Sequence, residues 1–134
     1  MGIKQIVHVD DDEDIRTIVQ IALEVVGQIE LIQFPDGNSA LSGLDGVTPD
    51  MFLLDVMMPV MSGPELYREL RGTPRLAQVP TVFVTAKAED SFGRQLCAEG
   101  AVAVITKPFD PMTLAETLHK IWSESRTAPL GQAI

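Results

Sequence analysis

The chain is poor in cysteine, in basic residues and in long apolar runs, and each shortage excludes a class of protein. Cys97 is the only cysteine, so no disulfide can form within the chain and no CxxC metal or redox motif is present. Lys and Arg number 10 against 19 Asp and Glu, and the net charge of −9 disfavours binding to nucleic acid or anionic membranes. No apolar run reaches a membrane-spanning length, and no signal-peptide core is evident. These absences predict a cytoplasmic protein that does not bind DNA or membranes directly.

The length and composition favour one compact domain. A chain of 134 residues with 46% hydrophobic residues can bury a core without disulfides or metals to support it. We assign residues 1–124 to this domain and expect Cys97 to be a buried apolar residue in it. Residues 125–134 contain Pro129 and Gly131 and show no clear periodicity, so they are predicted to form a mobile C-terminal tail.

Short β-branched segments alternate with amphipathic segments along the domain. The last amphipathic segment begins at Asp110-Pro111, which is typical of a helix N-cap followed by a first-turn proline. Five strands that alternate with five helices predict an α/β fold, a doubly wound parallel sheet covered on both faces. The predicted strands cover residues 3–9, 29–34, 51–54, 81–84 and 102–106, and the first four predicted helices cover residues 15–26, 38–44, 64–70 and 89–99.

Polar residues of a few chemical types stand where the predicted strands end. Asp10 and Asp11 follow the first strand, Asp55 the third, Thr85 the fourth and Lys107 the fifth. Ligands of such sheets bind beyond the carboxyl ends of the strands, so these side chains should meet at one edge. Three neighbouring carboxylates repel one another unless a cation lies between them. Mg²⁺, which prefers oxygen ligands, is therefore the predicted cofactor.

This set of groups is suited to phosphoryl transfer, in which catalysis consists mainly of positioning and neutralising oxygen charge. Asp55 is the predicted nucleophile and would become an acyl phosphate. Lys107 and Mg²⁺ would hold the phosphoryl oxygens, and the Thr85 hydroxyl would donate a hydrogen bond to one of them.

Four sequence motifs in this order resemble the receiver domains of two-component response regulators, over residues 3–123. They are VDDDEDIR (Val9 to Arg16), LLDVMMPVMSG (Leu53 to Gly63), VTA (Val84 to Ala86) and TKPF (Thr106 to Phe109). The resemblance implies a flavodoxin-like sheet with strand order 2-1-3-4-5.

At the level of single residues, the resemblance implies roles for the strand-end groups. It implies that Asp10, Asp11, Asp55 and the backbone carbonyl of Met57 bind the metal and that Asp55 is the phosphorylation site. It also implies a cis peptide bond at Lys107-Pro108. Thr85 matches the family's switch hydroxyl. The family often has an aromatic residue three positions before the lysine, where this chain has Val104, so the aromatic form of the switch is in question.

The implied function is a phosphorylation-dependent signalling switch. A sensor histidine kinase or a histidine phosphotransfer protein would donate the phosphoryl group to Asp55, and the altered surface would change binding to a downstream protein. Such a domain promotes its own phosphorylation and dephosphorylation but is not a turnover enzyme. The sequence leaves open whether the chain forms a homodimer, and whether it is a stand-alone regulator or the N-terminal receiver of a longer protein.

Simpler interpretations and two other functions compete with this one. An acidic run before a helix is often only a favourable helix start, and Asp55, Thr85 and Lys107 could each be an ordinary turn or surface residue. A haloacid dehalogenase-type phosphatase needs a second carboxylate two residues after its nucleophile, where this chain has Met57. A pseudo-receiver that binds partners without phosphorylation usually lacks one of the acidic or lysine positions, all of which are present here.

Overall fold

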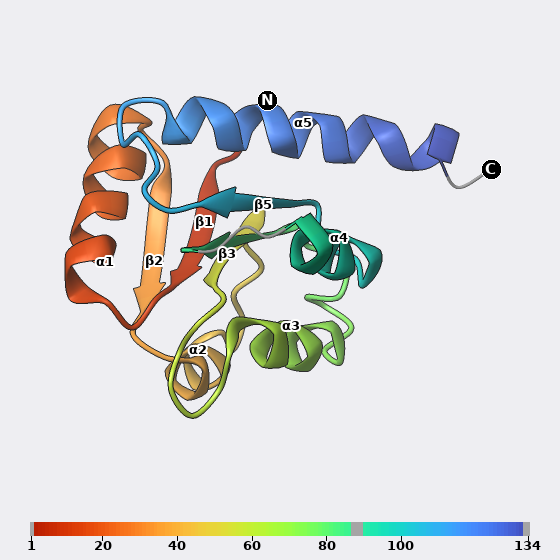
Figure 1. The fold of residues 1–134 in the computed structure, drawn as a ribbon, viewed down its shortest axis with the longest axis horizontal. Helices are drawn as coiled ribbons and strands as arrows, with labels where there is room; N and C mark the ends of the chain where they lie inside the picture. The colour runs from red at the N-terminus through yellow and green to blue at the C-terminus, as the bar shows by residue number, and fades with distance from the viewer. Residues whose placement is uncertain (1, 87–89, 133–134) are drawn as a thin grey trace.

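A five-stranded parallel sheet forms the centre of the computed structural model, which describes residues 2–86 and 90–132. The strands lie in the order β2-β1-β3-β4-β5, and every neighbouring pair is parallel (Figure 1). Both the predicted fold class and the predicted strand order are confirmed. The strands are β1 (Gln5–Val9), β2 (Glu30–Phe34), β3 (Met51–Asp55), β4 (Thr81–Thr85) and β5 (Ala103–Thr106).

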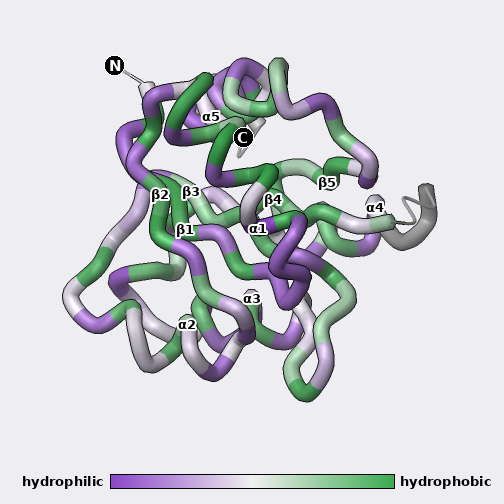
Figure 2. Tube along the Cα trace, turned by 90° about the vertical axis from the view of Figure 1, so that its left-hand side faces the viewer, coloured by the Kyte–Doolittle hydropathy of each residue, from purple (hydrophilic) through white to green (hydrophobic). Residues whose placement is uncertain are grey.

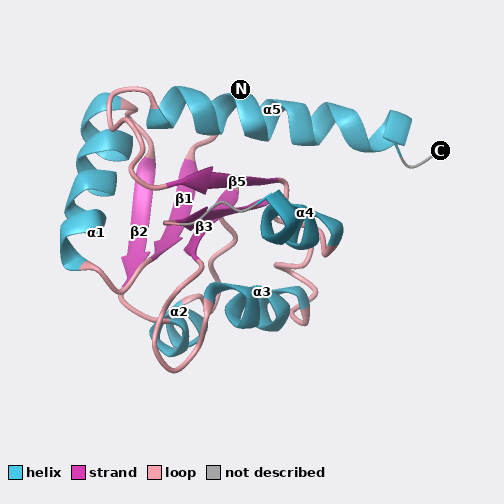
Figure 3. Cartoon of the chain, viewed as in Figure 1, coloured by secondary structure: helices cyan, strands magenta, loops and turns pink. Residues whose placement is uncertain are grey.

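Helices cover both faces of the sheet (Figure 3). Helices α1, η1 and α5 pack on one face, whereas α2, α3 and α4 pack on the other. Each crossover helix must return to the sheet to bury its apolar side, which explains the two layers. The helices are α1 (Glu13–Gln20), the π-helix η1 (Ile21–Val26), α2 (Gly37–Gly43), α3 (Gly63–Arg71), α4 (Asp90–Ala98) and α5 (Leu114–Gln132).

The core has two halves, one on each side of the sheet. Alternate residues of a strand point to opposite faces, so Phe52 packs under α3 and α4 whereas Leu53 packs under α1 and α5. Every residue of β3 and β4 is buried. In Figure 2 green hydrophobic segments run through the strands, and purple hydrophilic segments lie mostly in the surrounding helices and loops. Burial of each large apolar side chain contributes about 1.5–3 kcal/mol, which holds the strand ends in fixed positions.

Helices α1 and α3, which follow β1 and β3, both begin with side-chain caps close to the carboxyl ends of these strands. The Asp12 carboxylate caps α1 by accepting hydrogen bonds from the backbone N–H groups of Asp14 and Ile15. Ser62 and Glu65 form a reciprocal capping box at the start of α3. A Cβ on Gly63 would lie 2.2 Å from the Asp55 carbonyl oxygen, so only glycine lets α3 begin this close to β3. The caps therefore fix the loops that follow β1 and β3.

The first helix differs from the sequence prediction in its second half. Its residues 21–26 form a π-helix, in which the N–H of Gly27 bonds the carbonyl of Ala22. The wider turn rotates the later side chains away from the positions that an α-helical period predicts. Val26 stands four residues after the buried Ala22, where an α-helix would place it on the same face, but it is 39% exposed.

The last helix also differs at both ends. The Asp110 carboxylate accepts a hydrogen bond from the Met112 N–H, but it stabilises a separate turn, and α5 begins only at Leu114. The helix continues to Gln132, through most of the segment predicted as a tail. Pro129 and Gly131 therefore lie within the helix and do not end it, although both are unfavourable in a helix interior. The mobility of this segment stays a prediction.

The prediction that Cys97 is buried is wrong. Cys97 is exposed, because it lies beside the buried Leu96 on the helix and therefore faces about 100° away from it. The predicted start of this helix at Glu89 lies outside the described residues, and α4 begins at Asp90. Among the described residues, no helix is both long and apolar enough to cross a membrane.

Candidate functional site

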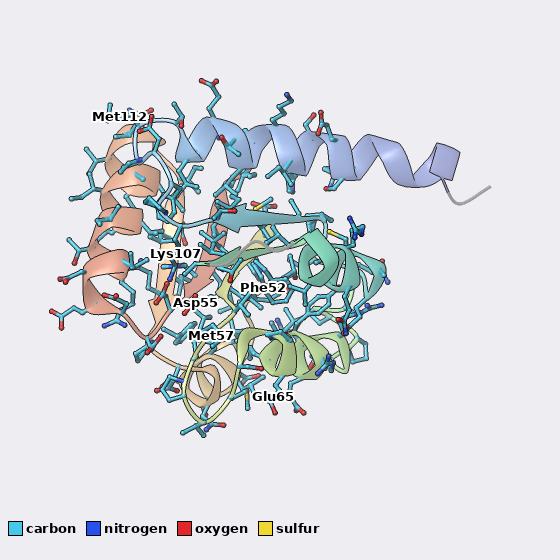
Figure 4. All side chains as sticks on the ribbon, viewed as in Figure 1. Phe52, Asp55, Met57, Glu65, Lys107 and Met112 are labelled. Carbon is cyan, nitrogen blue, oxygen red and sulfur yellow. The ribbon has the colours of Figure 1, made fainter. Side chains whose placement is uncertain are left out.

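The side chains predicted from the strand ends come together at one edge of the sheet. Asp10 directly follows β1, Asp55 is the last residue of β3, and Thr85 is the last residue of β4. Lys107 follows β5, and its backbone N–H donates a 2.8 Å hydrogen bond to the Thr85 carbonyl oxygen. Figure 4 shows Asp55 and Lys107 close together at this edge. The expected convergence of these strand ends is therefore observed.

Three carboxylates and one ammonium group form the centre of the site. Asp10, Asp11 and Asp55 each offer an oxygen, and these oxygens lie within 4.8 Å of one another. The Lys107 Nζ lies 3.1 Å from Asp10 Oδ2 and 3.1 Å from Asp55 Oδ1. Asp10 is fully buried, Asp55 is 5% exposed, and Asp11 is exposed. One lysine is thus shared by two buried carboxylates, while a third carboxylate faces the solvent beside them.

The pKa values in the site show that negative charge is only partly compensated. Burial, and then the charge of Asp10, raise the pKa of Asp55 from 3.8 to about 6, although Lys107 acts in the opposite direction. Burial alone lowers the pKa of Lys107, but hydrogen bonds to Asp55 and Asp10 outweigh it, so this pKa is raised. A hard cation bound to carboxylate oxygens would relieve the remaining repulsion. The donor set therefore fits Mg²⁺.

The other predicted site residues occupy distinct places. Thr85 is 3% exposed and lies on β4, which pairs with β5, the strand that Lys107 follows. Val104 is half-buried and packs against the core under α3 and α4, next to Phe83 in the sheet register. The Met57 side chain is 75% exposed in the loop after β3, and metal binding by its carbonyl stays a prediction. The Lys107-Pro108 peptide bond is cis, as the resemblance implied.

A family model for the response regulator receiver domain matches residues 6–119. The chain belongs to this family. It is 36% identical over 126 residues to the phosphate regulon transcriptional regulatory protein PhoB of Pseudomonas aeruginosa, a match that covers 94% of this chain and 54% of PhoB. It is 35% identical to an uncharacterized 14.6 kDa protein of Leptolyngbya boryana, over 86% of this chain and 87% of that protein. The structure of the chemotaxis protein CheY4 of Vibrio cholerae matches with a TM-score of 0.82 and 30% identity, over 90% of this chain and 99% of CheY4.

As a member of this family, the chain is a receiver domain of two-component signalling. Receiver domains act through phosphorylation and interact with sensor kinases and downstream effectors. The chain spans about half the length of PhoB and of the Bacillus subtilis relative PhoP, and both of these are transcriptional regulatory proteins. The comparisons therefore give no support to the expectation that the protein avoids nucleic acid. The acidic charge that motivated this expectation describes only these 134 residues.

Beneath Asp10 the receiver domain has a polar network that the sequence reasoning missed. The Arg16 Nη1 donates a 2.7 Å hydrogen bond to the Asp10 carbonyl, and the Asp12 N–H donates a 2.8 Å bond to Asp10 Oδ1. His8 is 1% exposed, and its Nε2 lies 4.0 Å from Asp10 Oδ2. Burial, together with the charges of Lys107 and Arg16, lowers the pKa of His8 to about 3. The sequence signal was a histidine two residues before Asp10, because side chains two apart in an extended chain point to the same side.

Proposed function

We propose that this receiver domain is a signalling switch that accepts a phosphoryl group on Asp55 with the help of Mg²⁺. The phosphoryl donor is the phosphohistidine of a sensor kinase or of a phosphotransfer protein, and phosphorylation changes the binding of a downstream partner. The domain acts stoichiometrically as a switch and not as a turnover enzyme. The observation that carries the proposal is the Lys107 Nζ placed 3.1 Å from both Asp10 and Asp55, beside a third carboxylate.

Each group has a chemical task in this proposal. An Asp55 carboxylate oxygen attacks phosphorus, an O–P bond forms, and the N–P bond of phosphohistidine breaks with its electron pair left on the imidazole nitrogen. Mg²⁺, held by Asp10, Asp11, Asp55 and the Met57 carbonyl, would neutralise charge on the phosphoryl oxygens. Lys107 donates a hydrogen bond to one phosphoryl oxygen, and the Thr85 hydroxyl donates to another.

The output half of the switch involves Thr85 and Val104. In this proposal Thr85 moves toward the phosphoryl group, and the displacement reaches α4 through β5. Val104 packs in the core next to Phe83, and a Cβ on Gly93 of α4 would lie 4.0 Å from Val104 Cγ2. Because Val104 has no ring to swing between two positions, the response depends on the α4 backbone.

Exposed apolar side chains support the partner-binding half of the proposal. Ile21 on η1 is 50% exposed, Met112 after β5 is 68% exposed, and Met57 and Val60 after β3 are 75% and 92% exposed. Met57 and Val60 lie in the loop that directly follows Asp55. Contiguous exposed apolar surface marks protein contact sites, and we assign partner contact to these exposed side chains as part of the proposal.

A small phosphodonor tests the chemistry separately from the partner. Incubation with acetyl phosphate and Mg²⁺ should add one phosphoryl group to the wild-type chain, measured by intact-protein mass spectrometry. Asp55→Asn should gain none, and chelation of Mg²⁺ with EDTA should abolish the reaction of the wild-type chain. Asp45→Asn is the matched control, because Asp45 is an exposed aspartate on another loop.

Several outcomes would contradict the proposal. Equal labelling of Asp55→Asn and the wild-type chain would exclude Asp55 as the acceptor. The absence of any phosphoryl mass would favour a pseudo-receiver, and steady turnover of a phosphomonoester would favour a phosphatase. Ile21→Asp then tests the partner surface: it should retain the acetyl phosphate reaction but lose phosphotransfer from purified sensor kinases that label the wild-type chain.

A further inference from the structure

The side chain of Gln33 connects two elements that hold Asp10. Gln33 lies on the edge strand β2, directly opposite His8 in the sheet register. Its Nε2 lies 2.9 Å from the Arg16 carbonyl oxygen and 3.0 Å from His8 Nδ1. One amide group therefore contacts both β1 and the first turn of α1.

These two contacts determine the position of the proton on His8. A backbone carbonyl can only accept a hydrogen bond, so the Gln33 atom beside Arg16 must be the amide nitrogen and not the oxygen. The same nitrogen has no lone pair to offer His8, so it must donate its second hydrogen to Nδ1. Nδ1 is then an acceptor, the ring is neutral, and its proton lies on Nε2.

The Nε2–H group faces the buried carboxylate of Asp10. Nε2 lies 4.0 Å from Asp10 Oδ2, which is too long for a hydrogen bond but near enough for a favourable contact between the N–H dipole and the negative charge. The opposite tautomer would direct a lone pair at the same oxygen. Gln33 also holds the Arg16 carbonyl, while the Arg16 guanidinium donates to the Asp10 carbonyl at 2.7 Å.

We propose that Gln33 is a positioning residue of the metal site, which fixes the His8 tautomer and the start of α1 so that the Asp10 carboxylate is held ready to bind Mg²⁺. The inference rests on the proposed function, because it assigns Asp10 to the metal. Partners of metal ligands commonly affect metal affinity by about 10-fold or more, although they do not touch the ion.

The tautomer is measured directly by ¹⁵N NMR of the His8 ring in EDTA. The wild-type chain should show a protonated Nε2 and an unprotonated Nδ1. Gln33→Met keeps the length of the side chain but cannot donate, so the tautomer preference should be lost. Gln33→Glu replaces the donor by an acceptor and should move the proton to Nδ1. Gln20→Met, on the exposed face of α1, is the matched control and should leave the ring unchanged.

Titration calorimetry with Mg²⁺ alone tests the functional part. Gln33→Met should bind Mg²⁺ about tenfold more weakly than the wild-type chain, while Gln20→Met should bind it equally well. An Nδ1–H tautomer in the wild-type chain, or unchanged affinity in Gln33→Met, would overturn the inference. The wild-type spectrum decides the tautomer even if Gln33→Met fails to fold. A wild-type chain that does not bind Mg²⁺ would overturn the proposed function and the positioning role together, whereas a wrong tautomer would overturn only the latter.

Discussion

Replacing the proposed phosphoacceptor should make the metal-free protein more stable. Asp55 is almost buried, next to Asp10 and Asp11, and its pKa is raised from 3.8 to about 6. The folded state therefore disfavours the ionised form of this carboxylate. An asparagine side chain at this position would retain the shape without the charge, so Asp55→Asn should remove an unfavourable electrostatic interaction.

The size of the effect follows from the pKa shift. One pKa unit corresponds to about 1.4 kcal/mol, so a rise from 3.8 to about 6 corresponds to roughly 3 kcal/mol. Water screens part of this repulsion at the open side of the site, and we expect a gain of about 2 kcal/mol in the free energy of unfolding. The proposed binding of Mg²⁺ to the folded wild-type chain should reverse the order of stability at saturating concentration.

The pH dependence has a defined sign. The wild-type carboxyl is protonated in both the folded and the unfolded chain below pH 3.8, so the two proteins should be equally stable there. Between pH 3.8 and about 6 only the unfolded chain is ionised at this residue, and the wild-type chain loses stability as the pH rises. His8, with its pKa lowered to about 3, acts in the opposite direction, but it contributes equally to both proteins and cancels in the difference.

Urea unfolding in EDTA, followed by the fluorescence of the single Trp122, measures this difference. Asp45→Asn is the control for the loss of a surface charge and should change the free energy of unfolding by less than about 0.5 kcal/mol. The reasoning is refuted if Asp55→Asn is less stable than the wild-type chain above pH 7, or if the difference between them does not change with pH.

Three further substitutions test how the site is built, each by urea unfolding. Gly63→Ala should lower the free energy of unfolding by about 2 kcal/mol, because its Cβ would lie 2.2 Å from the Asp55 carbonyl oxygen. Gly72→Ala is the control and should not destabilise the chain, because its Cβ would meet its nearest atom at 3.4 Å. Equal effects of the two substitutions would contradict the close approach of α3 to β3. Ser62→Ala removes the side-chain cap of α3 and should lower the free energy of unfolding by about 1 kcal/mol. An unchanged urea midpoint of unfolding would show that the capping box is not stabilising. Lys107→Met leaves the carboxylates of Asp10 and Asp55 without their shared cation, so its free energy of unfolding in EDTA at pH 8 should fall by about 2 kcal/mol or more. Mg²⁺ should restore part of this loss. A variant that is more stable than the wild-type chain in EDTA would contradict the pairing.

The sequence predicted the site because the fold class constrains it strongly. Once the strands are parallel, their carboxyl ends must share an edge, so Asp10, Asp55, Thr85 and Lys107 follow from the alternation of elements. The strand order and the cis peptide bond came from the family resemblance. Neither follows from local periodicity.

The features that were missed depend on geometry that periodicity does not encode. The π-helical turns of η1 have the same apolar spacing in sequence as an α-helix, yet they leave Val26 partly exposed. The contact of Gln33 with His8 requires the register of β1 and β2, which residue pattern alone does not determine. Cys97 was assigned from the usual burial of its residue type, whereas the helix places it beside the buried stripe.

Chemical mapping of the acyl phosphate tests the central claim most directly. Borohydride reduces an aspartyl phosphate to homoserine, which tandem mass spectrometry locates to a single residue. After reaction with a phosphohistidine donor and Mg²⁺, we predict homoserine at position 55 of the wild-type chain and nowhere else. Homoserine at another aspartate, or a stable phosphoryl group that borohydride does not release, would contradict the assignment of Asp55 as the phosphoacceptor.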